Sequence, residues 1–217
     1  MRKLTILILI IATLAMVSCV TQDYSAFKDS RPRSILVMPP VNQTVDITAP
    51  LTFISTATYP LAESGYYVIP VTLSSQTFIQ NGVTIAEEAH QIPHARLRQI
   101  FGADAALYIT ITNYGSNVNL LHGRARVLVT AEAKLVDLRT GVEIWTHKIY
   151  EEDSGQRVNT SGFGLLGFVA TVAVNQVINV VTDRAFDVGK KANNTLLSAN
   201  SYNGILYGPY HPKYDGE

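Results

Sequence analysis

The chain has 217 residues with 17 basic and 17 acidic side chains, and Cys19 is its only cysteine. Because the charges balance, the chain has no basic excess of the kind that binds nucleic acid. A single thiol excludes a disulfide framework within the chain. The length is that of one domain able to bury its own core. Loss of residues 1–18, which hold two basic and no acidic residues, leaves a formal charge of −2.

The amino-terminal segment has the layout of a secretory signal. A basic pair at residues 2–3 precedes an apolar run over residues 4–17, and Ser18 supplies a small residue directly before Cys19. The alternative is an uncleaved membrane helix, but a helix needs about 20 apolar residues to cross a bilayer and this run is shorter. We therefore expect a cleaved signal.

The residues before the cysteine decide which kind of signal is present. Residues 14–19, LAMVSC, resemble a bacterial lipobox, which implies a lipoprotein signal peptide over residues 1–18 and acylation of Cys19. Val20 stands where a retention signal for the inner membrane has aspartate, which implies sorting to the outer membrane. The polar residues 19–33 lack hydrophobic periodicity and are predicted to be a lipid-attached spacer.

The first predicted elements form a strand–helix–strand unit at the start of a single α/β domain over residues 34–193. A short apolar strand at residues 35–38 ends at two prolines. Helical spacing then runs from Asp46 to Gly65, and residues 66–71 form a second strand. If the two strands are parallel, this is a βαβ unit. The residues at helical spacing are Leu51, Ile54, Ser55, Thr58 and Leu61.

Short helices follow, and then the strands become antiparallel. Helices are predicted up to Gln80, over residues 85–91 and from Pro93 to Gly102. A strand at residues 105–112 comes next, and residues 124–136 alternate strictly between apolar and polar side chains.

The next two strands are predicted to form a hairpin over residues 136–145. Asp137 and Gly141 are spaced for a tight reversal between two alternating strands. We expect Trp145 to pack in the core rather than to bind a ligand.

An apolar stretch runs from Gly162 to Val181. A polar stripe led by Asn175 favours an amphipathic helix that covers the sheet over a membrane-inserted one. The glycine-rich start of this stretch is a candidate partner contact, and completion of the core by the same residues stays open as the alternative. The candidate contact residues are Gly162, Phe163, Gly164, Leu165, Leu166 and Phe168. Residues 194–217 are predicted to be a polar tail.

The residues offer little for catalysis or metal binding. His90 and His94 lie four apart beside Glu87 and Glu88, but Pro93 interrupts the helix that would bring them to one face. We therefore predict no metal site.

A Gly-x-Gly-x-x-Gly match at residues 162–167 lacks the buried strand that should precede it. Its nearest following acidic residue, Asp183, lies inside the expected helix. A lone match of this kind is weak, so we predict no cofactor and no enzyme.

Several longer motifs resemble one family of bacterial lipoproteins of unknown function, which includes a meningococcal surface antigen. They are DITAP from Asp46, YPLAESGYYV from Tyr59, FGADAALYI from Phe101 and AKLVDLRTG from Ala133. The resemblance implies an α/β fold with a mixed β-sheet flanked by helices, like the amino-terminal domain of TolB and the curli-secretion-type lipoproteins, with a C-terminal amphipathic helix. The resemblance implies no catalytic residues.

Two functions follow as hypotheses. The first is a non-enzymatic interaction module, anchored to the outer membrane through Cys19, that works in the periplasm within an envelope transport, secretion or assembly complex. The resemblance implies a curli-secretion-type lipoprotein or another envelope component as partner, and homo-oligomers and exposure on the cell surface stay open. The alternative is a lipoprotein that delivers a small molecule to a transporter from a pocket lined by tyrosines at strand ends.

Overall fold

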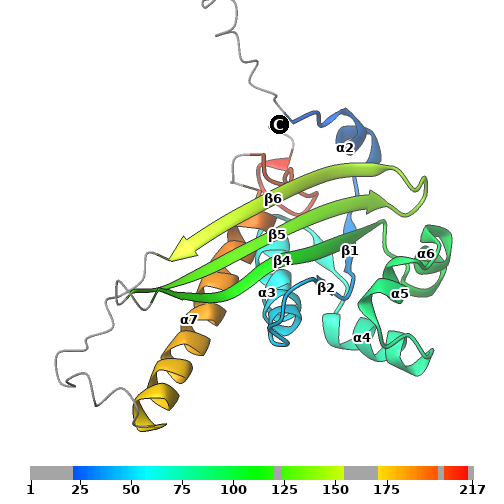
Figure 1. Ribbon diagram of the computed structural model, residues 1–217. Helices are drawn as coiled ribbons and strands as arrows, with labels where there is room; N and C mark the ends of the chain where they lie inside the picture. The colour runs from blue at the N-terminus through cyan, green and yellow to red at the C-terminus, as the bar shows by residue number, and fades with distance from the viewer. Residues whose placement is uncertain (1–21, 120–123, 154–170, 200–202, 215–217) are drawn as a thin grey trace, which may run out of the picture.

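The computed structural model describes residues 22–119, 124–153, 171–199 and 203–214, and side chains are described outside 116–125 and 171–183. A mixed sheet with the strand order β3-β1-β4-β5-β6 runs through the body, and β2 pairs with β4 beside this path. Helices pack on both faces of the sheet (Figure 1). The predicted α/β fold with a mixed sheet flanked by helices is confirmed.

The parallel part of the sheet confirms the βαβ unit. Strand β1 (Ser34–Val37) pairs in parallel with β3 (Tyr67–Val68), and helix α3 (Ala49–Glu63) connects them. Strand β3 is shorter than predicted because Pro70 has no N–H to donate and α4 (Val71–Gln80) begins directly after it. The helical prediction for α3 is right in span, but its buried face is rotated, since Leu51 is 67% exposed.

The antiparallel part follows the predicted alternation. Strand β4 (Ala105–Asn119) pairs with β5 (Arg124–Asp137), and β5 pairs with β6 (Glu143–Asp153). The apolar side of β5 is fully buried, as the period of two requires. Its members are Val127, Val129, Ala131, Ala133 and Leu135. Strand β4 also runs in parallel beside β1 and the short β2 (Val41–Asn42), so it joins the two parts of the sheet.

The hairpin between β5 and β6 is confirmed. The N–H of Asp137 donates to the Val142 carbonyl at 2.9 Å, and Gly141 takes a positive φ of 74° that favours glycine. A register shift after Leu135 lets both Ile144 and Trp145 face the core. Trp145 is 1% exposed, which agrees with a packing role.

The two faces of the sheet bury separate clusters. Helices α4, α5 (Ala86–His90) and α6 (His94–Phe101) lie on the side of the smaller cluster, which includes Leu36 and Leu97. Helix α3 and the carboxyl-terminal part of α7 (Thr171–Leu197) pack over the larger one. The sheet is therefore the middle layer of the body.

Helix α7 covers the sheet as the amphipathic prediction requires. Ala185, Val188, Ala192 and Leu196 are buried against the core. Among the described residues, no helix combines the length and the apolar character needed to cross a membrane. The side chains of the predicted polar stripe before residue 184 lie outside the described ones.

The structure differs from the predicted boundaries at both ends. Residues 19–33 were expected to be a spacer, but helix α2 (Ser25–Ser30) lies within them and Phe27 is 3% exposed in the core. Within the expected tail, Ile205 is 1% exposed. Periodicity misses both segments because each buries too few residues to form a pattern.

Candidate partner-binding surface

The sites predicted from sequence lie largely outside the described residues. Cys19 and the candidate contact at residues 162–168 both do, and so does the Gly-x-Gly-x-x-Gly match. Acylation of Cys19 and partner contact through residues 162–168 therefore stay predictions.

The two histidines lie on separate helices, as the position of Pro93 implied. His90 ends α5, and His94 begins α6 after Pro93. The His90 Nε2 atom lies 2.9 Å from the Pro39 carbonyl oxygen, and burial lowers the pKa of the imidazole. Within the described part of the chain, no group of histidine, cysteine and acidic side chains could hold a metal ion.

The ring of Tyr108 contacts both imidazole rings. Its ring centroid lies 5.0 Å from that of His90 and 6.2 Å from that of His94, both edge-on. Burial raises the pKa of the Tyr108 hydroxyl to about 12, and this oxygen has no hydrogen-bond partner among the described residues. The three rings form a packed aromatic contact rather than an acid–base pair.

Three strongly exposed apolar side chains lie within seven residues of the chain. Val45 and Ile47, in the loop between β2 and α3, are 100% and 86% exposed, and Leu51 in the first turns of α3 is 67% exposed. We call Val45, Ile47 and Leu51 the apolar patch. Exposed apolar side chains are a feature of sites that bind another molecule, so we take these three residues as the candidate contact.

Polar side chains hold this loop in shape. The N–H of Thr44 donates to the Asn42 carboxamide oxygen at 3.1 Å, and the N–H of Thr48 donates to the Asp46 carboxylate at 2.8 Å. The Asn42 amide also donates to the Asp46 carbonyl at 2.8 Å. Because these bonds connect residues two or four apart, the loop is ordered locally while its apolar side chains stay in solvent.

Sequence reasoning missed this patch. The signal was present, because polar residues at 42, 44, 46 and 48 alternate with Val45 and Ile47. Alternation alone does not tell a strand from a loop that is held by its own side chains.

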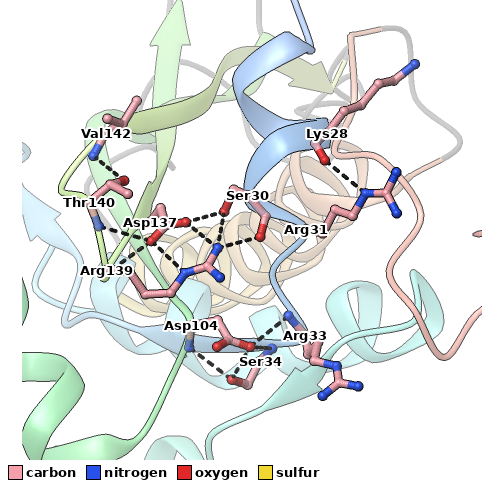
Figure 2. A network of polar contacts seen from close by, with 10 residues as sticks. All are labelled: Lys28, Ser30, Arg31, Arg33, Ser34, Asp104, Asp137, Arg139, Thr140 and Val142. Atoms are coloured by element: carbon pink, nitrogen blue, oxygen red, sulfur yellow. Dashed lines mark hydrogen bonds and ion pairs between the residues drawn. The ribbon is translucent and has the colours of Figure 1, made fainter.

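A polar network holds α2 at the other end of the body (Figure 2). The Ser30 hydroxyl donates to the Asp137 carboxylate at 2.5 Å, and the Arg139 guanidinium donates to the same carboxylate at 2.7 Å. Burial alone would raise the pKa of Asp137, but the hydrogen bonds from Arg139 and Ser30 outweigh it and lower that pKa to about 2.

A second carboxylate, that of Asp104, holds the residues that lead from α2 into β1. Asp104 accepts hydrogen bonds from the N–H groups of Arg33 at 3.0 Å and Ser34 at 3.3 Å. The Ser34 hydroxyl in turn accepts from the N–H of Asp104 at 3.0 Å. Helix α2 and the strand that follows it are therefore both attached to the body.

Fold and surface together define an α/β domain with a mixed sheet, a docked amino-terminal helix and an exposed apolar loop. Residues 22–210 match the family described as "Putative lipoprotein GNA1162-like". The chain belongs to this GNA1162-like family of lipoproteins, which confirms the resemblance inferred from its motifs.

Named relatives agree with this membership. "Putative lipoprotein NMB1124/NMB1162" of Neisseria meningitidis serogroup B is 42% identical over 203 residues, which cover 91% of this chain and 92% of that protein. The crystal structure of lipoprotein GNA1162 from Neisseria meningitidis is 40% identical with a TM-score of 0.54, and it covers 68% of this chain and 99% of that one. Neither name states an enzymatic activity.

A more distant solved structure is the PelC dodecamer from Paraburkholderia phytofirmans. It is 13% identical, covers 76% of this chain and 86% of that one, and has a TM-score of 0.43. At this identity and TM-score, the comparison supports no conclusion about individual residues of the present chain.

Proposed function

We propose that this chain is an outer-membrane lipoprotein, acylated on Cys19, whose α/β domain is a non-enzymatic interaction module of an envelope transport, secretion or assembly complex. Membership of a lipoprotein family supports the anchor. The observation that carries the interaction role is the apolar patch, because it exposes two β-branched side chains almost completely on an ordered loop.

An ordered loop binds at a smaller entropic cost than a mobile one. The backbone N–H groups of Thr44 and Thr48 donate to the side chains of Asn42 and Asp46, and these bonds hold the loop before any partner arrives. Burial of Val45, Ile47 and Leu51 then contributes hydrophobic free energy at about 25 cal/mol per Å². This combination fits a protein partner with an apolar surface of its own.

Two buried tyrosines, Tyr66 before β3 and Tyr114 within β4, do not favour the small-molecule alternative. The Tyr66 hydroxyl donates to the Leu206 carbonyl at 2.5 Å, and the Tyr114 and Thr52 hydroxyls lie 2.9 Å apart. Both tyrosine rings fill the core. A hollow of about 450 Å³ lies beside residues 22–28, but it is open to solvent.

The test is crosslinking in intact cells. A photo-crosslinking amino acid replaces Ile47 in the affinity-tagged protein, and a matched control places it at Val142, which is 50% exposed on the hairpin. We expect an envelope protein to be captured from position 47 and not from 142, and capture to weaken with Cys19→Ala. Equal capture from both positions, or capture of bulk lipid only, would contradict the proposal.

A further inference from the structure

The attachment of α2 shortens the tether between lipid and body. Phe27 lies in the core, the Tyr24 hydroxyl donates to the Gly204 carbonyl at 2.6 Å, and Ser30 donates to Asp137. The folded body therefore begins at Tyr24, ten residues before the predicted start at Ser34.

The reach of the tether follows from covalent geometry. Five residue steps separate Cys19 from Tyr24, and an extended chain of that length spans at most about 18 Å. A spacer that ran to Ser34 would reach about 50 Å. With acyl chains on Cys19, Tyr24 cannot leave the bilayer surface by more than the shorter distance.

The residues that follow the tether carry exposed cations. Lys28, Arg31 and Arg33 are exposed, and Figure 2 shows their charged ends pointing away from the polar network. Among the described residues, none of the three forms an ion pair. Within residues 22–33 the acids are Asp23 and Asp29, both exposed, so this segment has an excess of one positive charge that complements anionic headgroups.

The apolar patch lies at the far end of α3 from this segment. Gly204 contacts Tyr24, and the N–H of Gly208 donates to the Ser64 carbonyl at 2.7 Å, which places the carboxyl end of α3 on the side of α2. Helix α3 has 15 residues and a length of about 22 Å, and the loop that carries Val45 and Ile47 leads into its amino end.

We propose that α2 and the residues beside it form a membrane-facing surface that rests on an anionic phospholipid bilayer and turns the apolar patch away from it. The partner of this surface is the bilayer that holds the acyl chains. The proposal rests on acylation of Cys19, which belongs to the proposed function. It adds an orientation, so that a partner reaches the apolar patch from the aqueous side.

The test uses the full acylated protein in vesicles of phosphatidylethanolamine and phosphatidylglycerol that contain a nickel-chelating lipid. Because Cys19 is the only cysteine, Ser25→Cys and Ile47→Cys each introduce one free thiol for a spin label. We expect the nickel lipid to relax the label at 25 severalfold more than the label at 47. Equal or reversed relaxation would overturn the orientation.

A spacer variant tests the cause. An insertion of about 20 Gly and Ser residues after Thr21 releases the body from the short tether, and neutral vesicles remove the attraction to the cations. We expect the two labels to relax equally under these conditions, and a difference that persisted would contradict the role of the tether. Mass spectrometry of the amino-terminal peptide separates the two proposals, because an unacylated Cys19 overturns both and an acylated protein without orientation overturns only this one.

Discussion

Helix α2 and the loop between β2 and α3 are both short polar segments beside the sheet. They differ in the burial of their apolar side chains: those of α2 enter the core, whereas those of the loop lie in solvent. Phe27 of α2 is 3% exposed, whereas Val45 of the loop is 100% exposed. Ser30 bonds to Asp137 across 107 positions of the chain, while Asp46 bonds to Thr48 two positions away. Long-range hydrogen bonds tie a segment to the core, and local ones order a loop without covering it.

The largest expected effect comes from Phe27→Ala. Removing a buried phenylalanine side chain costs about 3 kcal/mol or more of unfolding free energy, because transfer and cavity costs add. Urea unfolding of the mature chain, followed by fluorescence of the single tryptophan, Trp145, measures the loss. Phe186→Ala is the matched control, since Phe186 is 43% exposed and should lose much less. Equal losses would restore the spacer interpretation of residues 19–33.

The next effect is that of Asp137→Asn. The folded-state pKa of about 2 lies below the ordinary aspartate value of 3.8, so the ionised carboxylate contributes about 2 kcal/mol above the unfolded-state pKa. This stability is lost as the pH falls through the folded-state pKa. We expect the wild type to be more stable than the variant near neutral pH, and the gap in urea-unfolding free energy to close in acid. A gap that did not change with pH would show that the charge of Asp137 is not involved.

A smaller loss is expected from Asp46→Ala in the loop. The variant removes the acceptor for the N–H and hydroxyl of Thr48, at a cost of about 1 kcal/mol. Asp29→Ala serves as the control because Asp29 is exposed on α2. Chemical unfolding of both variants under identical conditions makes the comparison. A loss as large as that of Phe27→Ala would mean that the loop supports the core.

The smallest effect on stability is expected from Ile47→Asn. The side chain is 86% exposed, so the free energy of unfolding should change by less than about 0.5 kcal/mol. The same variant should lose most of the partner capture in cells. Capture at the wild-type level would show that the apolar patch does not bind the partner.

The local pattern of apolar, polar and turn residues was enough to predict several elements of the fold. The period of two in β5 identified its buried side, and the spacing of Asp137 and Gly141 identified the hairpin. It was not enough for the face of α3, because a helix with apolar side chains all round can pack in more than one rotation. Leu51 therefore lies in solvent instead of in the core.

The register of β6 and the candidate surface were less predictable than these elements. Burial of Ile144 beside Trp145 depends on a register shift that no pattern of two residues reveals. The exposure of Val45 depends on the path of the loop, and the same alternation in a paired strand would bury it.

The sequence by itself determined the signal-like amino terminus, the mixed α/β class, the hairpin and the family, because each depends on neighbouring residues or on motifs. Only the tertiary structure decided that α2 belongs to the body and that the apolar patch does not belong to the core. Phe27 is buried in the core cluster with residues that are distant in the chain, and Asp137 and Ser30 come together from positions 107 residues apart. Contacts of this kind leave no period in the sequence, since their spacing is set by the path of the chain.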